Sequence, residues 1–156
     1  MLNNDVLRRV RYIFDLNDTR IQAIFAMADH AVTQDQISIW FKREDDRGFK
    51  EMKDRELAIF LNGFITARRG KKDGPKPEPE NVLTNNLILW KLRIALNLKS
   101  NDLMQVMKLG EFPISEHELS ALFRRPGHKH YRECKDQILR YFLVGLTKKY
   151  RPETAD

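Results

Sequence analysis

The stretch NNLILWKLRIALNL, residues 85–98, repeats the pattern of NNDVLRRVRYIFDL at residues 3–16. Both begin with two asparagines, followed at the same distances by a leucine and an arginine. Apolar residues recur in each at spacings of three and four, which is typical of one buried face of a helix. The chain therefore contains one amphipathic helix twice, which indicates an internal duplication.

The duplication extends over most of the chain. A shift of 82 residues aligns residues 3–69 with residues 85–151 without a gap, and sixteen pairs are identical. These pairs are Asn3/Asn85, Asn4/Asn86, Leu7/Leu89, Arg11/Arg93, Leu16/Leu98, Ser38/Ser120, Phe41/Phe123, Arg43/Arg125, Glu51/Glu133, Lys53/Lys135, Asp54/Asp136, Leu57/Leu139, Phe60/Phe142, Leu61/Leu143, Gly63/Gly145 and Arg69/Arg151. We expect an all-α protein: a tandem duplication of a four-helix unit, about eight helices in all, related by a pseudo-twofold axis.

Helix signals occur at matching places in the two copies. Asn4 and Asn86 are of the residue type that caps helix N-termini, and both precede an apolar stripe. Gly63 and Gly145 fall within the fourth expected helix, where glycine costs about 1 kcal/mol relative to alanine. We therefore expect a neighbouring helix to approach closely at both glycines.

The expected domains are a first helical repeat at residues 1–70, a linker at 71–84 and a second repeat at 85–156. Three prolines in the linker forbid helix and favour an extended, semi-rigid segment.

Composition narrows the class of protein. Residues are 42% hydrophobic and 32% charged, which is typical of a globular chain. The absence of a long apolar run or secretory pattern predicts a cytoplasmic protein without a membrane span. The net charge of +6 is concentrated in residues 85–156, with 13 Lys/Arg against 8 Asp/Glu. A basic second half attracts nucleic acid or acidic partners.

The repeat, the paired asparagines and the stretch FRRPGHKHYRECKDQ at residues 123–137 together resemble the YehS-type family of bacterial proteins. Members of that family carry two tandem copies of a domain of unknown function. The resemblance covers nearly the whole chain and implies a small cytoplasmic helical protein. It brings no catalytic residue, binding residue or cofactor.

The second and third helices of each copy have the rhythm of a helix-turn-helix motif, with Thr33 and Ser115 capping the third helix. Base edges and phosphates are bound by amide and cationic side chains. The first copy offers Gln34, Gln36, Lys42 and Arg43. The second copy presents Glu116, His117 and Glu118, a poor surface for DNA. The alternative is an ordinary helical pair, since the turn is longer than the usual three to four residues.

The stretch after the third helix of the second copy is strongly basic. Its cations are Arg124, Arg125, Lys129, Arg132 and Lys135, against the single acid Glu133. Such a segment predicts contact with phosphates or RNA, where its tyrosine would stack on a base. Alternatively, the two arginines stabilise the negative end of the third helix and the rest is a solvated loop. Because the first-copy stretch is nearly neutral, only the second copy is expected to bind.

His128, His130 and Cys134 are of residue types that ligate zinc. A structural zinc site needs a fourth ligand, and the nearest candidate is His117 on another helix. We therefore expect no metal and no cofactor, and we expect Cys134 to be a small buried group like Met52 in the first copy.

Two charged positions are shared by the copies. We expect structural ion pairs from Arg11 to Asp54 and from Arg93 to Asp136, with each aspartate also capping the fourth helix that it begins. Anion binding by the two arginines is the alternative.

The chain has no phosphate-binding glycine loop, no Gly-x-Ser-x-Gly motif and no His-Glu-x-x-His motif. We therefore expect a non-catalytic binding or regulatory protein that presents a helical surface to a macromolecular partner, either protein or nucleic acid. If the partner is a protein, we expect an exposed apolar patch near Trp90 or Tyr12.

Overall fold

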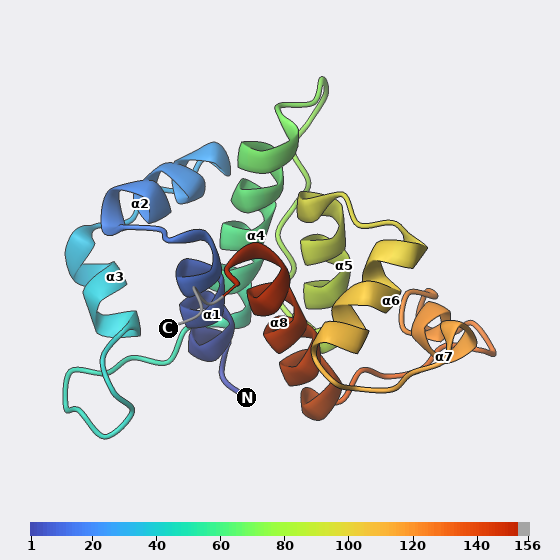
Figure 1. The fold of residues 1–156 in the computed structure, drawn as a ribbon. Helices are drawn as coiled ribbons and strands as arrows, with labels where there is room; N and C mark the ends of the chain where they lie inside the picture. The colour runs from blue at the N-terminus through green and yellow to red at the C-terminus, as the bar shows by residue number, and fades with distance from the viewer. Residues whose placement is uncertain (153–156) are drawn as a thin grey trace. The chain divides into compact units, whose positions relative to one another are not determined.

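The computed structural model describes residues 1–152, and every regular element in that range is an α-helix (Figure 1). The helices are α1 (Asn3–Phe14), α2 (Asp18–Met27), α3 (Gln34–Trp40), α4 (Asp54–Arg69), α5 (Asn85–Leu96), α6 (Ser100–Leu109), α7 (Glu116–Ala121) and α8 (Asp136–Tyr150). Each helix of the second half begins 82 residues after its counterpart. The predicted all-α class and tandem duplication are confirmed. No helix in the described range is long and apolar enough to cross a membrane.

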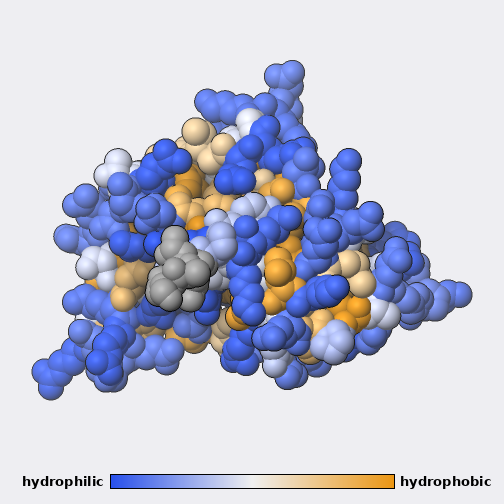
Figure 2. Space-filling model, in the orientation of Figure 1, coloured by the Kyte–Doolittle hydropathy of each residue, from blue (hydrophilic) through white to orange (hydrophobic). Residues whose placement is uncertain are grey.

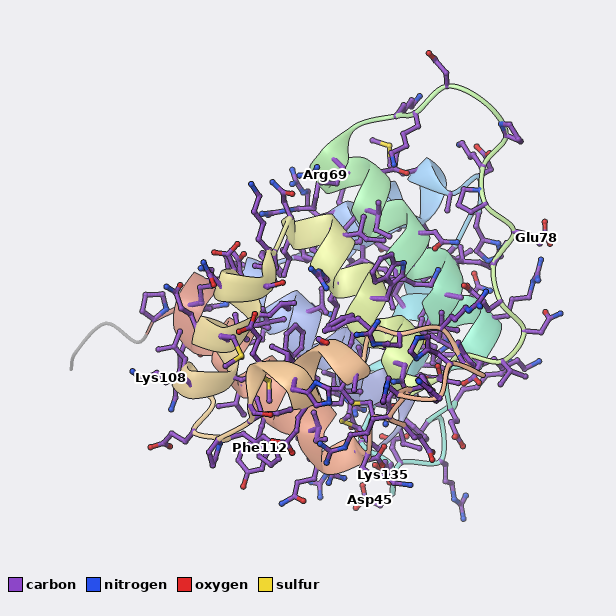
Figure 3. All side chains as sticks on the ribbon, turned by 90° about the vertical axis from the view of Figure 1, so that its right-hand side faces the viewer. Asp45, Arg69, Glu78, Lys108, Phe112 and Lys135 are labelled. Atoms are coloured by element: carbon purple, nitrogen blue, oxygen red, sulfur yellow. The ribbon has the colours of Figure 1, made fainter. Side chains whose placement is uncertain are left out.

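The chain forms two compact units, the first covering Met1–Leu83 and the second beginning at Thr84. The proline-rich segment belongs to the first unit, where Figure 3 shows Glu78 on an extended stretch. Arg55 on α4 contacts the Glu78 carboxylate at 3.0 Å and the Pro79 carbonyl at 3.1 Å. The backbone N–H of Leu83 donates to Asp54 at 2.9 Å. The segment that we expected to be a linker between the repeats is therefore docked on α4.

The closest helix crossings are those of α2 with α4 and of α6 with α8. A Cβ atom at Gly63 would overlap the carbonyl oxygen of Ile24 on α2, and one at Gly145 would overlap that of Val106 on α6. The predicted close approach is confirmed at both glycines. Only a residue without a side chain lets the two backbones come this near.

The two cores fill corresponding positions with different side chains. In the first unit, Phe25 packs against Trp40 and Phe60, with ring centroids 5.6 and 5.4 Å apart. The corresponding residues of the second unit are Met107, Leu122 and Phe142. All of them are buried. The helix frame therefore accepts either an aromatic or an aliphatic interior, provided that the positions remain apolar.

Helix caps confirm part of the prediction. Thr33 and Ser115 cap α3 and α7, since their hydroxyls accept from the N–H groups three residues later at 3.1 and 3.0 Å. Asn4 and Asn86 are not caps. The helices α1 and α5 begin one residue earlier, and both asparagines are buried inside the first turn. Their amides have other partners far along the chain.

Candidate functional site

Asn86 holds the loop between α7 and α8. Its Oδ1 accepts from the Cys134 N–H at 2.9 Å. Its Nδ2 donates to the carbonyls of Leu122 and Arg132 at 3.0 and 2.8 Å. The amide is buried, so each bond replaces one that water would otherwise make. Asn86 therefore clips both ends of the loop to α5.

The preceding asparagine secures the start of the last helix. Asn85 Nδ2 donates to the Cys134 carbonyl at 3.1 Å and to the Asp136 carboxylate at 2.8 Å. In the first unit, Asn3 and Asn4 make the same contacts. Their partners are Trp40, Lys50, Met52 and Asp54, each 82 residues before its counterpart. The asparagine pair seen in the sequence is thus a structural clip for the loop.

The predicted pair of Arg11 with Asp54 is wrong. Arg11 lies 3.3 Å from Asp18 and stacks on the Phe41 ring at 4.5 Å. Asp54 accepts from Asn3 instead. Arg11 follows Asn3 by eight positions, about 12 Å along the helix axis, which places the guanidinium at the other end of α1.

The same holds for Arg93 and Asp136. Arg93 donates to the Leu98 carbonyl at 3.1 Å and stacks on the Phe123 ring at 4.8 Å, whereas Asp136 accepts from Asn85. Each aspartate begins its helix as predicted, but does not cap it: the N-cap residues of α4 and α8 are lysines. The arginines therefore support the aromatic residue at the start of the loop.

An aromatic and basic surface forms where α5 meets this loop. We name it the Trp90 surface and define it by Trp90, Phe123, Arg124, Arg125 and Lys129. The Trp90 side chain is 45% exposed, and its ring centroid lies 6.4 Å from that of Phe123. The three cations are exposed. The surface thus combines an accessible indole with positive charge.

Carboxylates neutralise the other two predicted cations of the loop. Arg132 lies 3.2 Å from Glu118, and Lys135 lies 3.1 Å from Glu133. Hydrogen bonds from the Ser115 backbone and hydroxyl, together with the charge of Arg132, lower the pKa of Glu118. Within the described residues, the cations of the Trp90 surface form no ion pair, so their charge remains available to an anionic partner.

The corresponding place in the first unit is occupied differently. Arg8 stands where the second unit has Trp90, and donates to the Lys42 carbonyl at 2.6 Å. Its guanidinium also pairs with Asp5 at 3.1 Å. In the adjoining loop, Arg43 lies 3.3 Å from Asp45. Charge is therefore balanced locally, and no indole is presented.

The helix-turn-helix candidates do not form a basic recognition face. Gln36 accepts from the Thr33 N–H at 2.9 Å and is part of the cap of α3. Gln34 lies at the start of that helix, whereas Lys42 and Arg43 follow its end. In the second unit, the six-residue α7 carries exposed carboxylates that phosphates would repel. The arrangement favours the ordinary helical pair.

Three histidines gather beside the loop. The His130 ring centroid lies 5.6 Å from that of His128 and 6.2 Å from that of His117. Cys134 is separate from them: it is 2% exposed, and its thiol donates to the Lys135 carbonyl at 3.5 Å. Burial raises the pKa of Cys134 to about 12. No group of three or more His, Cys, Asp or Glu side chains in residues 1–152 could hold a metal ion.

An apolar groove on the second unit was not predicted. It has a volume of about 720 Å³ and lies between α6 and the segment that leads to α7. Figure 3 shows Lys108 on α6 and Phe112 on that segment, and Figure 2 shows apolar surface over α6. Its apolar lining is Met104, Met107, Phe112, Pro113 and Ile114. The short run Phe-Pro-Ile is its one local sequence signal.

The comparisons identify the family. The model described as "Protein of unknown function (DUF1456)" matches residues 3–70 and again residues 85–151. The chain belongs to this family. It is 45% identical over 147 residues to the Uncharacterized protein YehS of Escherichia coli (strain K12), a match covering 94% of each chain. No solved structure matches the chain significantly. The double match agrees with the two units of the DUF1456 fold seen here.

Proposed function

We propose that the protein is a non-catalytic binding protein whose Trp90 surface holds a single strand of nucleic acid. The observation that carries the proposal is the exposed indole of Trp90 beside Phe123, next to cations that pair with no carboxylate in residues 1–152. Bases stack on exposed aromatic rings, and lysine and arginine contact the phosphates between them. Both kinds of contact are offered by one surface.

A folded duplex fits this surface less well than a flexible strand. The exposed carboxylates of α7 adjoin the loop, and they would repel the second row of phosphates of a duplex. A single strand can lay its backbone along Arg124, Arg125 and Lys129 while one unstacked base meets Trp90. Stacking contributes about 1 to 3 kcal/mol per base, largely independent of base identity.

The one cysteine of the chain is not available as a nucleophile. The Cys134 thiol is buried, and its pKa of about 12 keeps it protonated at neutral pH. A thiol attacks only as the thiolate. We therefore assign Cys134 to packing rather than to chemistry.

The experiment is a fluorescence-anisotropy titration of a labelled pyrimidine RNA of about 12 nucleotides, a length within the range of single-strand sites. Affinity should fall steeply as salt rises from about 50 to about 200 mM. The variant R124E/R125E/K129E should bind about 100-fold more weakly, and Trp90→Ala about tenfold more weakly.

The first unit supplies a matched control. Lys42, Arg43 and Arg47 occupy the positions corresponding to Arg124, Arg125 and Lys129. The variant K42E/R43E/R47E changes the net charge equally but should alter the affinity only about threefold, through long-range charge. Equal losses in the two triple variants would show that net charge rather than this surface binds RNA. Absence of any RNA binding by the wild-type protein would reject the proposal.

A further inference from the structure

The first unit docks its own proline-rich segment at the end of α2. Lys76, within the sequence GPKPEPE at residues 74–80, donates to the Met27 carbonyl at 3.0 Å. Its ammonium also lies 2.9 Å from the carboxylate of Asp29. Asp29, two residues after the end of α2, has a left-handed backbone with φ 58°. A helix C-terminus and a carboxylate together make a site for an ammonium group.

The second unit repeats this site, and no proline-rich segment within residues 84–152 docks on it. Leu109 and Glu111 correspond to Met27 and Asp29, and Glu111 has the same left-handed backbone with φ 61°. The Glu111 carboxylate is 83% exposed, with Lys148 at 3.6 Å. The Leu109 side chain is 41% exposed. The carboxylate of this site is therefore largely exposed to solvent, with Lys148 beside it, and can accept a further ammonium group.

The apolar groove adjoins this site and differs from its first-unit counterpart. Phe112 packs against Tyr141 with ring centroids 5.0 Å apart and lines the groove next to Glu111. In the first unit, Gln22 donates to the Val32 carbonyl at 3.0 Å and ties α2 to the following segment. Met104 replaces Gln22 in the second unit, and a thioether cannot donate this bond. The groove thus remains open and apolar.

We propose that this groove is a docking site for an extended, proline-rich, lysine-containing segment of another protein. Grooves lined by aromatic residues bind the polyproline conformation, whose backbone is extended before binding. The prolines would lie against Phe112 and Ile114, and the lysine would reach Glu111 and the Leu109 carbonyl. Lys76 of this chain is already held by Asp29 in the first unit, so the occupant is a different chain. The site is separate from the Trp90 surface.

The test is titration of the full chain with a labelled peptide of sequence GPKPEPE, followed by anisotropy. Saturable binding is expected. Glu111→Lys should weaken it about fivefold or more, because attraction becomes repulsion. Phe112→Ala should weaken it about tenfold, as for an aromatic residue at the centre of an interface. His30→Ala, at the position that corresponds to Phe112, should leave the affinity within about twofold.

A charge swap separates binding from folding. A peptide with glutamate in place of lysine should bind the wild-type protein weakly but regain affinity for Glu111→Lys. No saturable binding, equal losses in His30→Ala and Phe112→Ala, or failure of the charge swap would each overturn the proposal. Concentration-dependent self-association that Lys76→Glu abolishes would also overturn it, because the occupant would then be a second copy.

Discussion

The loop at residues 40–53 and the loop at residues 122–135 share a frame and differ in their surface. A buried asparagine clips each loop to the first helix of its unit through the same three hydrogen bonds. The first loop carries five cations against four acids, and the second carries five against one. Position 8 is an arginine bound to backbone, whereas position 90 is an exposed tryptophan. We infer that the duplicated frame supports a surface specific to the second unit.

The buried and exposed positions differ for an energetic reason. When a buried side chain that hydrogen-bonds to the backbone is removed, the backbone group has no partner and water cannot reach it. This costs about 1 to 3 kcal/mol per group. Exchange of an exposed side chain usually changes the free energy of unfolding by less than about 0.5 kcal/mol. The buried asparagines are therefore the same in both units, whereas the exposed side chains of the two loops can differ.

The largest expected effect is at the helix crossing that both units need. Gly145→Ala places a Cβ atom onto the Val106 carbonyl, and backbone cannot give way as a side chain does. The free energy of unfolding should fall by more than about 3 kcal/mol, beyond the usual cost of over-packing. Gly48→Ala is the control, because its neighbour is the flexible end of Lys42. Urea denaturation measures both variants. A loss of less than about 1 kcal/mol in Gly145→Ala would contradict the close backbone approach at this crossing.

The clip itself should rank second. Asn86→Ala removes three hydrogen bonds and leaves the Cys134 N–H and two carbonyls without a partner. Stability should fall by about 2 to 3 kcal/mol. Asn4→Ala should cost a similar amount in the first unit, measured by the same denaturation. Much less loss in one unit than in the other would mean that the two clips are not equivalent.

Cys134 and Met52 offer a pH comparison at one position of the clip. Because burial raises the pKa of Cys134 to about 12, folding favours the neutral thiol. Its contribution to stability is full below about pH 8.5, the ordinary thiol pKa, and is lost as the pH rises toward 12. Between about pH 8 and about pH 10, the free energy of unfolding of the wild-type protein should therefore fall by about 1 kcal/mol more than that of Cys134→Met. Denaturation curves at both pH values measure this difference, and parallel losses would show that the thiol is not buried.

The smallest effect concerns the corrected ion pair. A double-mutant cycle on Arg11 and Asp18 should give a coupling of about 0.5 kcal/mol, since both side chains are partly exposed. The cycle on Arg11 and Asp54 should give a coupling near zero. A larger coupling in the second cycle would restore the pairing that the structure replaces. Thermal or urea unfolding of the single and double variants provides the values.

Most of the helical frame could be predicted from the sequence. The apolar stripes, the caps at Thr33 and Ser115 and the glycines at 63 and 145 are local signals, and each proved to have the expected structural place. The arginine pairs failed because the sequence shows that two residues recur, but not which partner lies within reach. The basic loop was visible as charge, whereas the pairing of Arg132 and Lys135 with glutamates was not.

The sequence by itself determined that one all-α unit occurs twice, because helical period and an 82-residue repeat are properties of the chain order. Only the tertiary structure decided what the asparagine pair does, since its partners lie 36 to 51 residues away. It also decided that an exposed Trp90 lies beside Phe123 and that an apolar groove lies beside Glu111. Contacts between distant residues depend on how helices cross, and backbone approach at two glycines sets that crossing.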